Sequence, residues 1–148
     1  MLSRKRTLVL FVLWALLGTA GAEWQTGYGK ALAKAKAEHK KVLLDFTGSD
    51  WCPPCIALRK RVFSQPEFRA YADKNLVAVE IDYPRHKQQS ANLKKQNERL
   101  AGQYRIVEKG FPTVILLNPE GKMVREFTDY GGESVADVIA WIEGRKRL

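Results

Sequence analysis

A short apolar segment that runs directly into a turn and then a helix is the feature that most constrains the fold. Val42–Phe46 is apolar except for Asp45, and such a run bounded by a turn is typical of a strand buried on both faces. Gly48-Ser49-Asp50 supplies the turn. Between Cys52 and Val62 the apolar positions recur at helical spacing, while Arg59–Arg61 take the polar faces. This segment therefore predicts a strand, a turn and a helix in direct succession.

The rest of the chain alternates between predicted helices and strands. The expected elements are, in chain order, a helix over 28–39, the strand over 42–46, the helix with the two cysteines, a short helix that ends near residue 74, a strand over 76–82, a helix whose apolar face includes Leu93 and Tyr104, strands over 113–117 and 123–127, and a helix capped by Ser134. A strand–helix–strand crossover followed by a hairpin predicts an α/β fold, with a mixed central sheet of about four strands and helices on both faces.

The first 22 residues predict a secretory signal peptide. They combine a basic start at Arg4–Arg6, an apolar run over Thr7–Leu17 and small residues over Gly18–Ala22. We expect cleavage after the last of these, which leaves residues 23–148 as a single domain that is periplasmic or secreted. The alternative is an uncleaved anchor, although the apolar run is shorter than the roughly 20 residues that a spanning helix needs.

The charge of the chain favours acidic partners over nucleic acid. The net charge is +9, from 25 Lys and Arg against 16 Asp and Glu, and an excess of this kind favours solubility and attraction to acidic molecules. Because no RNA-binding or DNA-binding motif accompanies it, we expect no nucleic-acid partner. The chain is long enough to bury a core without disulfide staples, and we expect a monomer.

The two cysteines, Cys52 and Cys55, lie at the predicted start of a helix that follows a buried strand. A thiol at a helix N-terminus is close to free backbone N–H groups and to the positive end of the helix dipole, which stabilise the thiolate and lower its pKa. Cys52 is therefore the predicted nucleophile. Cys55 lies on the apolar face of the helix and is predicted to be the more buried, resolving thiol. Trp51 precedes the nucleophile, where a partner must dock, which predicts a surface-facing aromatic contact.

Three interpretations of the cysteine pair without redox chemistry fit the sequence less well. A zinc site would need two further ligands, and His39 and His86 do not have finger spacing. A haem attachment motif would need a histidine where Ile56 stands. A structural disulfide would close a very short loop, and the stabilisation from a cross-link grows with loop length. Redox exchange is therefore favoured, with no metal and no organic cofactor.

Three segments resemble the thioredoxin superfamily, and the resemblance covers nearly the whole expected exported chain. They are Trp51-Cys52-Pro53-Pro54-Cys55, the strand that ends Leu44-Asp45-Phe46, and Gly110-Phe111-Pro112-Thr113. Within the superfamily, Val62-Phe63-Ser64-Gln65-Pro66-Glu67 is similar to the exported branch that includes the C-terminal domain of the disulfide reductase DsbD. The resemblance implies a thioredoxin fold and thiol–disulfide exchange.

The resemblance also implies roles for three further residues. Pro112 would be a cis-proline that faces the disulfide, and Phe111 would shape the substrate groove. Asp45 would be the buried acid that moves a proton to and from the resolving thiol.

Two departures of this sequence from the thioredoxin pattern bear on these roles. The turn 48–50 makes the loop after Asp45 one residue longer than in ordinary thioredoxin, and 106–109 lengthens the approach to the groove. The alternative for Asp45 is a strand carboxylate with structural hydrogen bonds.

These features predict an exported thiol–disulfide oxidoreductase that acts on the disulfides and thiols of other proteins. The branch that the chain resembles is a reducing one, so reduction is the expected direction, with disulfide oxidation or isomerisation as the alternative. A reductant in an oxidising compartment needs an electron donor, which we expect to be a membrane-embedded partner. A function of another class is also open: a thioredoxin-like module that binds client chains beside Phe111 and Pro112 without catalysis.

Overall fold

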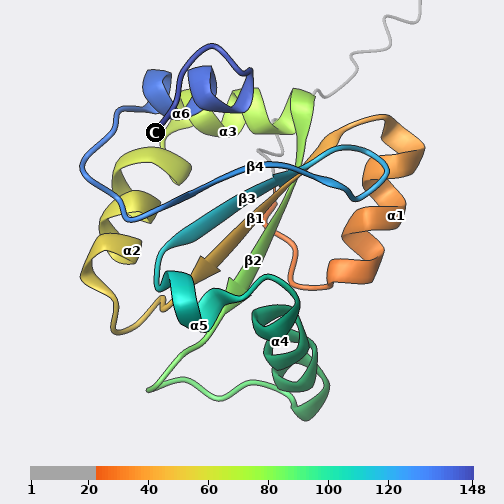
Figure 1. Cartoon of the computed structure of the whole chain (residues 1–148), viewed down its shortest axis with the longest axis vertical. Helices are drawn as coiled ribbons and strands as arrows, with labels where there is room; N and C mark the ends of the chain where they lie inside the picture. Colours follow the sequence, from red (N-terminus) through yellow and green to blue (C-terminus); the bar gives the residue numbers. More distant parts are fainter. Residues whose placement is uncertain (1–22) are drawn as a thin grey trace, which may run out of the picture.

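The computed structural model describes residues 23–148, so the predicted signal peptide lies outside the described residues. Helices and strands alternate around one sheet (Figure 1). The elements are α1 (Tyr28–Glu38), β1 (Lys41–Thr47), α2 (Pro53–Leu58), η1 (Arg59–Phe63), α3 (Pro66–Asn75), β2 (Leu76–Asp82), α4 (Ala91–Gln103), α5 (Ile106–Lys109), β3 (Thr113–Leu117), β4 (Met123–Thr128) and α6 (Val135–Ile142). Among these helices, none is long and apolar enough to cross a bilayer.

The sheet has four strands in the order β2-β1-β3-β4. β1 pairs in parallel with β2, whereas the β1–β3 and β3–β4 pairs are antiparallel. After Lys41, every residue of β1 is buried, because the strand is central and helices cover both faces. The predicted α/β fold, with its mixed four-stranded sheet, is confirmed.

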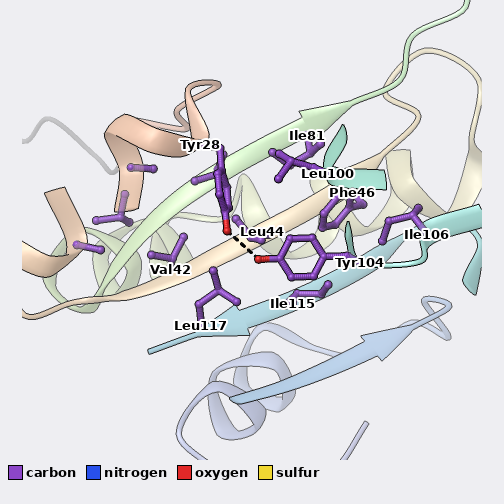
Figure 2. Packing of buried hydrophobic residues seen from close by; sticks show 14 residues of the cluster. Tyr28, Val42, Leu44, Phe46, Ile81, Leu100, Tyr104, Ile106, Ile115 and Leu117 are labelled. Carbon is purple, nitrogen blue, oxygen red and sulfur yellow. Dashed lines mark hydrogen bonds between the residues drawn. The ribbon is translucent and has the colours of Figure 1, made fainter. Parts of the chain in front are cut away.

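Alternate residues of β1 divide the core into two clusters. Val42, Leu44 and Phe46 face α1 and α4, where they pack with Tyr28 and Tyr104 among others. Figure 2 shows the hydroxyl groups of these two tyrosines pointing toward one another across this cluster, 2.8 Å apart. The hydrogen bond ties the start of α1 to the end of α4.

The opposite face of the sheet packs against α2, η1, α3 and α6. Leu43 of β1 lies in this second cluster with Leu58, Phe63 and Trp141 among others. Because side chains alternate along a strand, Asp45 and Thr47 share the face of Leu43. The acid of β1 is thereby directed toward the helix that begins at the cysteines.

The helix after the cysteines contains a π-helical turn. α2 begins at Pro53, where a proline is tolerated because its missing N–H would have no intrahelical partner. In η1 the N–H of Ser64 donates to the carbonyl of Arg59, five residues back, at 2.8 Å. This turn contains one residue more than an ordinary helical turn. Helical periodicity predicted the helix but not the π turn.

Candidate active site: a disulfide at the start of a helix

Cys52 and Cys55 are bonded to each other, with their Cα atoms 5.3 Å apart. Cys52 is the N-cap of α2, and its Sγ accepts a hydrogen bond from the backbone N–H of Cys55 at 3.4 Å. The two side chains are similarly buried, with 3% and 2% of their surfaces exposed. The predicted difference in burial between the two thiols is therefore absent in the disulfide state. The N–H that contacts Cys52 is a donor that would stabilise a thiolate at this atom.

Trp51 lies between the disulfide and the loop that follows β2. Its indole N–H donates to the carbonyl of Tyr83 at 2.7 Å, and the Arg85 guanidinium lies 3.8 Å from the centre of its ring. A Cβ atom at Gly48 would lie 2.4 Å from the same ring, so only glycine fits there. Trp51 is half-buried, and it is less free to face a partner than the sequence predicted.

Phe111 and Pro112 come directly before β3, and Phe111 lies beside this tryptophan. The peptide bond between them is cis, Pro112 is buried and Phe111 is half-buried. The ring of Phe111 meets that of Trp51 edge-on at 5.7 Å and lies 5.3 Å from that of Tyr83. Three aromatic rings from separate segments therefore form one group that includes the residue before Cys52. Sequence reasoning missed Tyr83, whose position directly after β2 at the same sheet edge was the available signal.

The turn before the disulfide is attached to the loop after β2 by polar contacts. The Asp50 carboxylate accepts hydrogen bonds from the backbone N–H groups of Arg85 and His86, at 2.9 and 2.8 Å. The bond from Arg85 is the main cause of the lowered pKa of Asp50. The Ser49 hydroxyl and backbone N–H both donate to the Asp82 carboxylate. The turn 48–50 thus positions both the disulfide and the loop.

Asp45 is buried, with 2% of its surface exposed, on the face of the sheet that packs against α2 and η1. Its Oδ2 lies 3.8 Å from Nη2 of Arg59, and within residues 23–148 its Oδ1 accepts no hydrogen bond. Burial raises the pKa of Asp45 to about 7, Arg59 opposes the rise, and Glu80 and Asp82 add to it. A carboxyl group with a pKa near neutrality can both accept and release a proton at physiological pH.

A pocket of about 280 Å³ lies beside the disulfide on this side of the molecule. Cys55, Thr47, Ile56 and Arg59 are among the residues that line it. The pocket therefore brings Cys55 and Arg59, the ion-pair partner of Asp45, to one solvent-accessible space. Over the same described range, no group of three or more His, Cys, Asp or Glu side chains is placed to hold a metal ion.

Comparisons with known proteins identify the family. Residues 28–144 match the family described as Thioredoxin-like domain. The Disulfide bond reductase DsbH of Chlamydia pneumoniae is 34% identical over 108 residues, which cover 73% of this chain and 63% of that protein. The Thiol:disulfide interchange protein DsbD 2 of Pseudomonas aeruginosa is 33% identical over 93 residues, which cover 63% of this chain but only 14% of the relative.

Solved structures agree with this assignment. A structure titled DsbH Oxidoreductase superposes with a TM-score of 0.75 at 32% identity, over 87% of this chain and 88% of that one. The predicted resemblance to thioredoxins and to DsbD proteins is confirmed. The chain belongs to the thioredoxin-like family, and it has the CxxC cysteine pair of a thiol–disulfide oxidoreductase.

Proposed function

We propose that this protein is an exported reductant of protein disulfides, in which Cys52 is the nucleophile and Cys55 the resolving thiol. The observation that carries the proposal is the Cys52–Cys55 disulfide at the N-terminus of α2, with a backbone N–H directed at the Cys52 sulfur. A disulfide between residues only three apart closes a very short loop, and such a cross-link gives little stability. It is suited instead to opening and closing during exchange.

The reaction proceeds in two exchanges. The Cys52 thiolate attacks one sulfur of a substrate disulfide, so a mixed disulfide forms and the other substrate sulfur leaves as a thiolate. Cys55 then loses its proton and attacks Cys52, which forms the Cys52–Cys55 disulfide and releases the second substrate sulfur as a thiolate. The substrate gains two electrons and the protein loses two. Asp45 takes the proton that Cys55 gives up.

The aromatic residues beside the disulfide are the proposed substrate contacts. Trp51, the residue before Cys52, forms an apolar wall with Phe111, and Pro112 comes directly before β3. A polypeptide that presents its own cysteine to Cys52 would lie against this wall. The expected substrates are therefore the disulfides and thiols of other proteins.

Reduction is the proposed direction because DsbH is named a disulfide bond reductase and is similar to this chain. The electron donor would be a membrane-embedded partner, since an oxidising compartment does not supply electrons. The measured reduction potential of the Cys52–Cys55 pair tests the direction. A value near that of thioredoxin, about −270 mV, supports a reductant, whereas one near about −120 mV identifies a disulfide donor.

Insulin reduction tests the exchange itself. The protein should accelerate the reaction with dithiothreitol as electron source, and Cys52→Ser should abolish the acceleration. Cys55→Ser should instead accumulate a mixed disulfide with the substrate, because the resolving step is missing. Acceleration that survives in Cys52→Ser would overturn the mechanism. Undiminished binding of unfolded chains by that variant, with no exchange by the native protein, would favour a client-binding module.

Export and the single-domain organisation are part of the same proposal. Residues 1–22 would direct export and be removed, which leaves 23–148 as the functional domain. N-terminal sequencing of the protein recovered from the periplasm or medium tests this. A first residue of Glu23 is the expected result, and recovery of the full chain in the membrane fraction would contradict it.

A further inference from the structure

Arg59 lies between two carboxylates and next to the resolving cysteine. We propose that Arg59, held in place by Glu80 and Trp24, is a positioning residue that sets how readily Asp45 exchanges a proton with Cys55. This inference rests on the proposed function, because it concerns the proton that leaves Cys55 in the second exchange. Arg59 itself touches neither the substrate nor the reacting sulfur atoms.

The sheet register brings the two carboxylates together. Asp45 of β1 is paired with Glu80 of the parallel strand β2, so the two acids are neighbours on one face. Nη2 of Arg59 lies 2.9 Å from Oε2 of Glu80 but 3.8 Å from Oδ2 of Asp45. Glu80 is therefore the closer ion-pair partner of the guanidinium group, although within residues 23–148 Nη2 makes no hydrogen bond, and Asp45 receives the weaker interaction.

Trp24 fixes the guanidinium from another side. The Arg59 Cζ atom lies 4.5 Å from the centre of the Trp24 ring, a distance typical of a cation–π contact. The same ring packs on Phe63 at 5.0 Å, which connects this contact to the second core cluster. Arg59 keeps 31% of its side chain exposed, so its charge is partly screened where it faces solvent.

The charges around Asp45 act in opposite directions. Burial and the carboxylates of Glu80 and Asp82 raise its pKa, and only Arg59 lowers it. Both acids come from β2 and the cation comes from η1, while β3 places the apolar Val114 opposite Asp45. Loss of Arg59 should therefore raise the pKa of Asp45, and loss of the Glu80 charge should lower it.

The pocket beside the disulfide connects Arg59 to the thiol that reacts in the second exchange. Arg59 and Cys55 line the same pocket, and the backbone N–H of Arg59 donates to the carbonyl of Cys55, so the residue that controls Asp45 lies one helical turn from the thiol that must lose a proton. In the second exchange, the Asp45 carboxylate takes the Cys55 proton and becomes a neutral carboxyl group. When the loss of Arg59 raises the pKa of Asp45, the carboxyl group is already protonated at neutral pH. It then cannot accept the proton from Cys55.

Carbon-13 NMR titration of the Asp45 carboxyl group in the oxidised protein tests the electrostatic part. Arg59→Met should raise the titration midpoint by about one to three units, the range for loss of an adjacent arginine, and Glu80→Gln should lower it. Arg59→Lys keeps the positive charge and should restore most of the native midpoint. Arg61→Met is the matched control, because Arg61 lies in the same turn without an ion pair to either carboxylate in the described structure.

The rate of the second exchange tests the catalytic part. Its pH midpoint, measured by release of substrate from a preformed mixed disulfide, should shift in the same direction as the NMR midpoint in each variant. Asp45→Asn should remove that inflection in every background. An unshifted NMR midpoint in Arg59→Met would overturn the inference. NMR shifts without matching rate shifts would overturn the role of Asp45 as proton acceptor. Absence of any exchange by the native protein would instead refute the proposed function.

Discussion

Asp45→Asn should make the protein more resistant to unfolding as the pH rises. The native carboxyl is buried, and its pKa is raised from 3.8 to about 7, chiefly by burial. Between about pH 4 and pH 7 the unfolded chain has released this proton while the folded protein still holds it, so raising the pH favours unfolding. Asparagine has nearly the shape of the neutral carboxyl group and has no proton to lose.

The magnitude follows from the pKa difference. One unit corresponds to about 1.4 kcal/mol, so a rise from 3.8 to about 7 corresponds to about 4 kcal/mol. The native protein loses this stability on passing from about pH 4 to above about pH 8. The variant avoids that loss, so its advantage in free energy of unfolding should grow by about 4 kcal/mol over the same interval.

Urea unfolding of both oxidised proteins, followed by circular dichroism at several pH values, measures this advantage. Taking the difference between the two proteins cancels every other group that titrates alike in both. Asp73→Asn controls for loss of a carboxylate at the exposed surface of α3. If the native protein and Asp45→Asn differ by the same free energy at about pH 5 and about pH 8.5, the reasoning is refuted.

Two further substitutions test packing around the site and in the core. Gly48→Ala places a Cβ 2.4 Å from the ring of Trp51, so it should lower the free energy of unfolding by about 1–3 kcal/mol. Gly102 is exposed in α4, and a Cβ there meets nothing within 4 Å. Gly102→Ala should therefore raise the free energy of unfolding by up to about 1 kcal/mol. Equal urea midpoints for the two variants would contradict this. Tyr28→Phe leaves the buried Tyr104 hydroxyl without its partner and should cost about 1–3 kcal/mol. Adding Tyr104→Phe should recover part of that cost, and strictly additive effects in a double-mutant cycle would refute the coupling.

The strand, the cysteine turn and the layered fold could be predicted because they depend on neighbouring residues. The apolar run Val42–Phe46 indicates a buried strand, and the β1–β2 and β3–β4 pairings follow from the predicted crossover and hairpin. Cys52 and Cys55 were placed correctly at a helix start for the same reason. Local pattern was sufficient wherever the decisive contacts are close in sequence.

Contacts between distant segments escaped prediction. Helical periodicity assigned Arg59 to a polar face, yet its partner is Glu80, and only the register of two parallel strands brings them together. Tyr83 lies beside Trp51 because the loop after β2 is attached to the turn at Asp50. Neither residue type nor spacing encodes these pairs, since each depends on three-dimensional packing that is set by the whole sheet.

The π turn allows its helix to hold one extra residue without rotating one end relative to the other. In an ordinary α-helical turn an extra residue would advance the chain by about 100° around the helix axis, yet Cys55 before the turn and Val62 and Phe63 within it are all buried. The wider turn absorbs that rotation, so removing one residue from 59–63 would restore ordinary winding and leave both buried faces in place. A single-residue deletion in this turn should therefore be tolerated better than one in the ordinary turns of α2, where it would rotate the cysteine end away from the core.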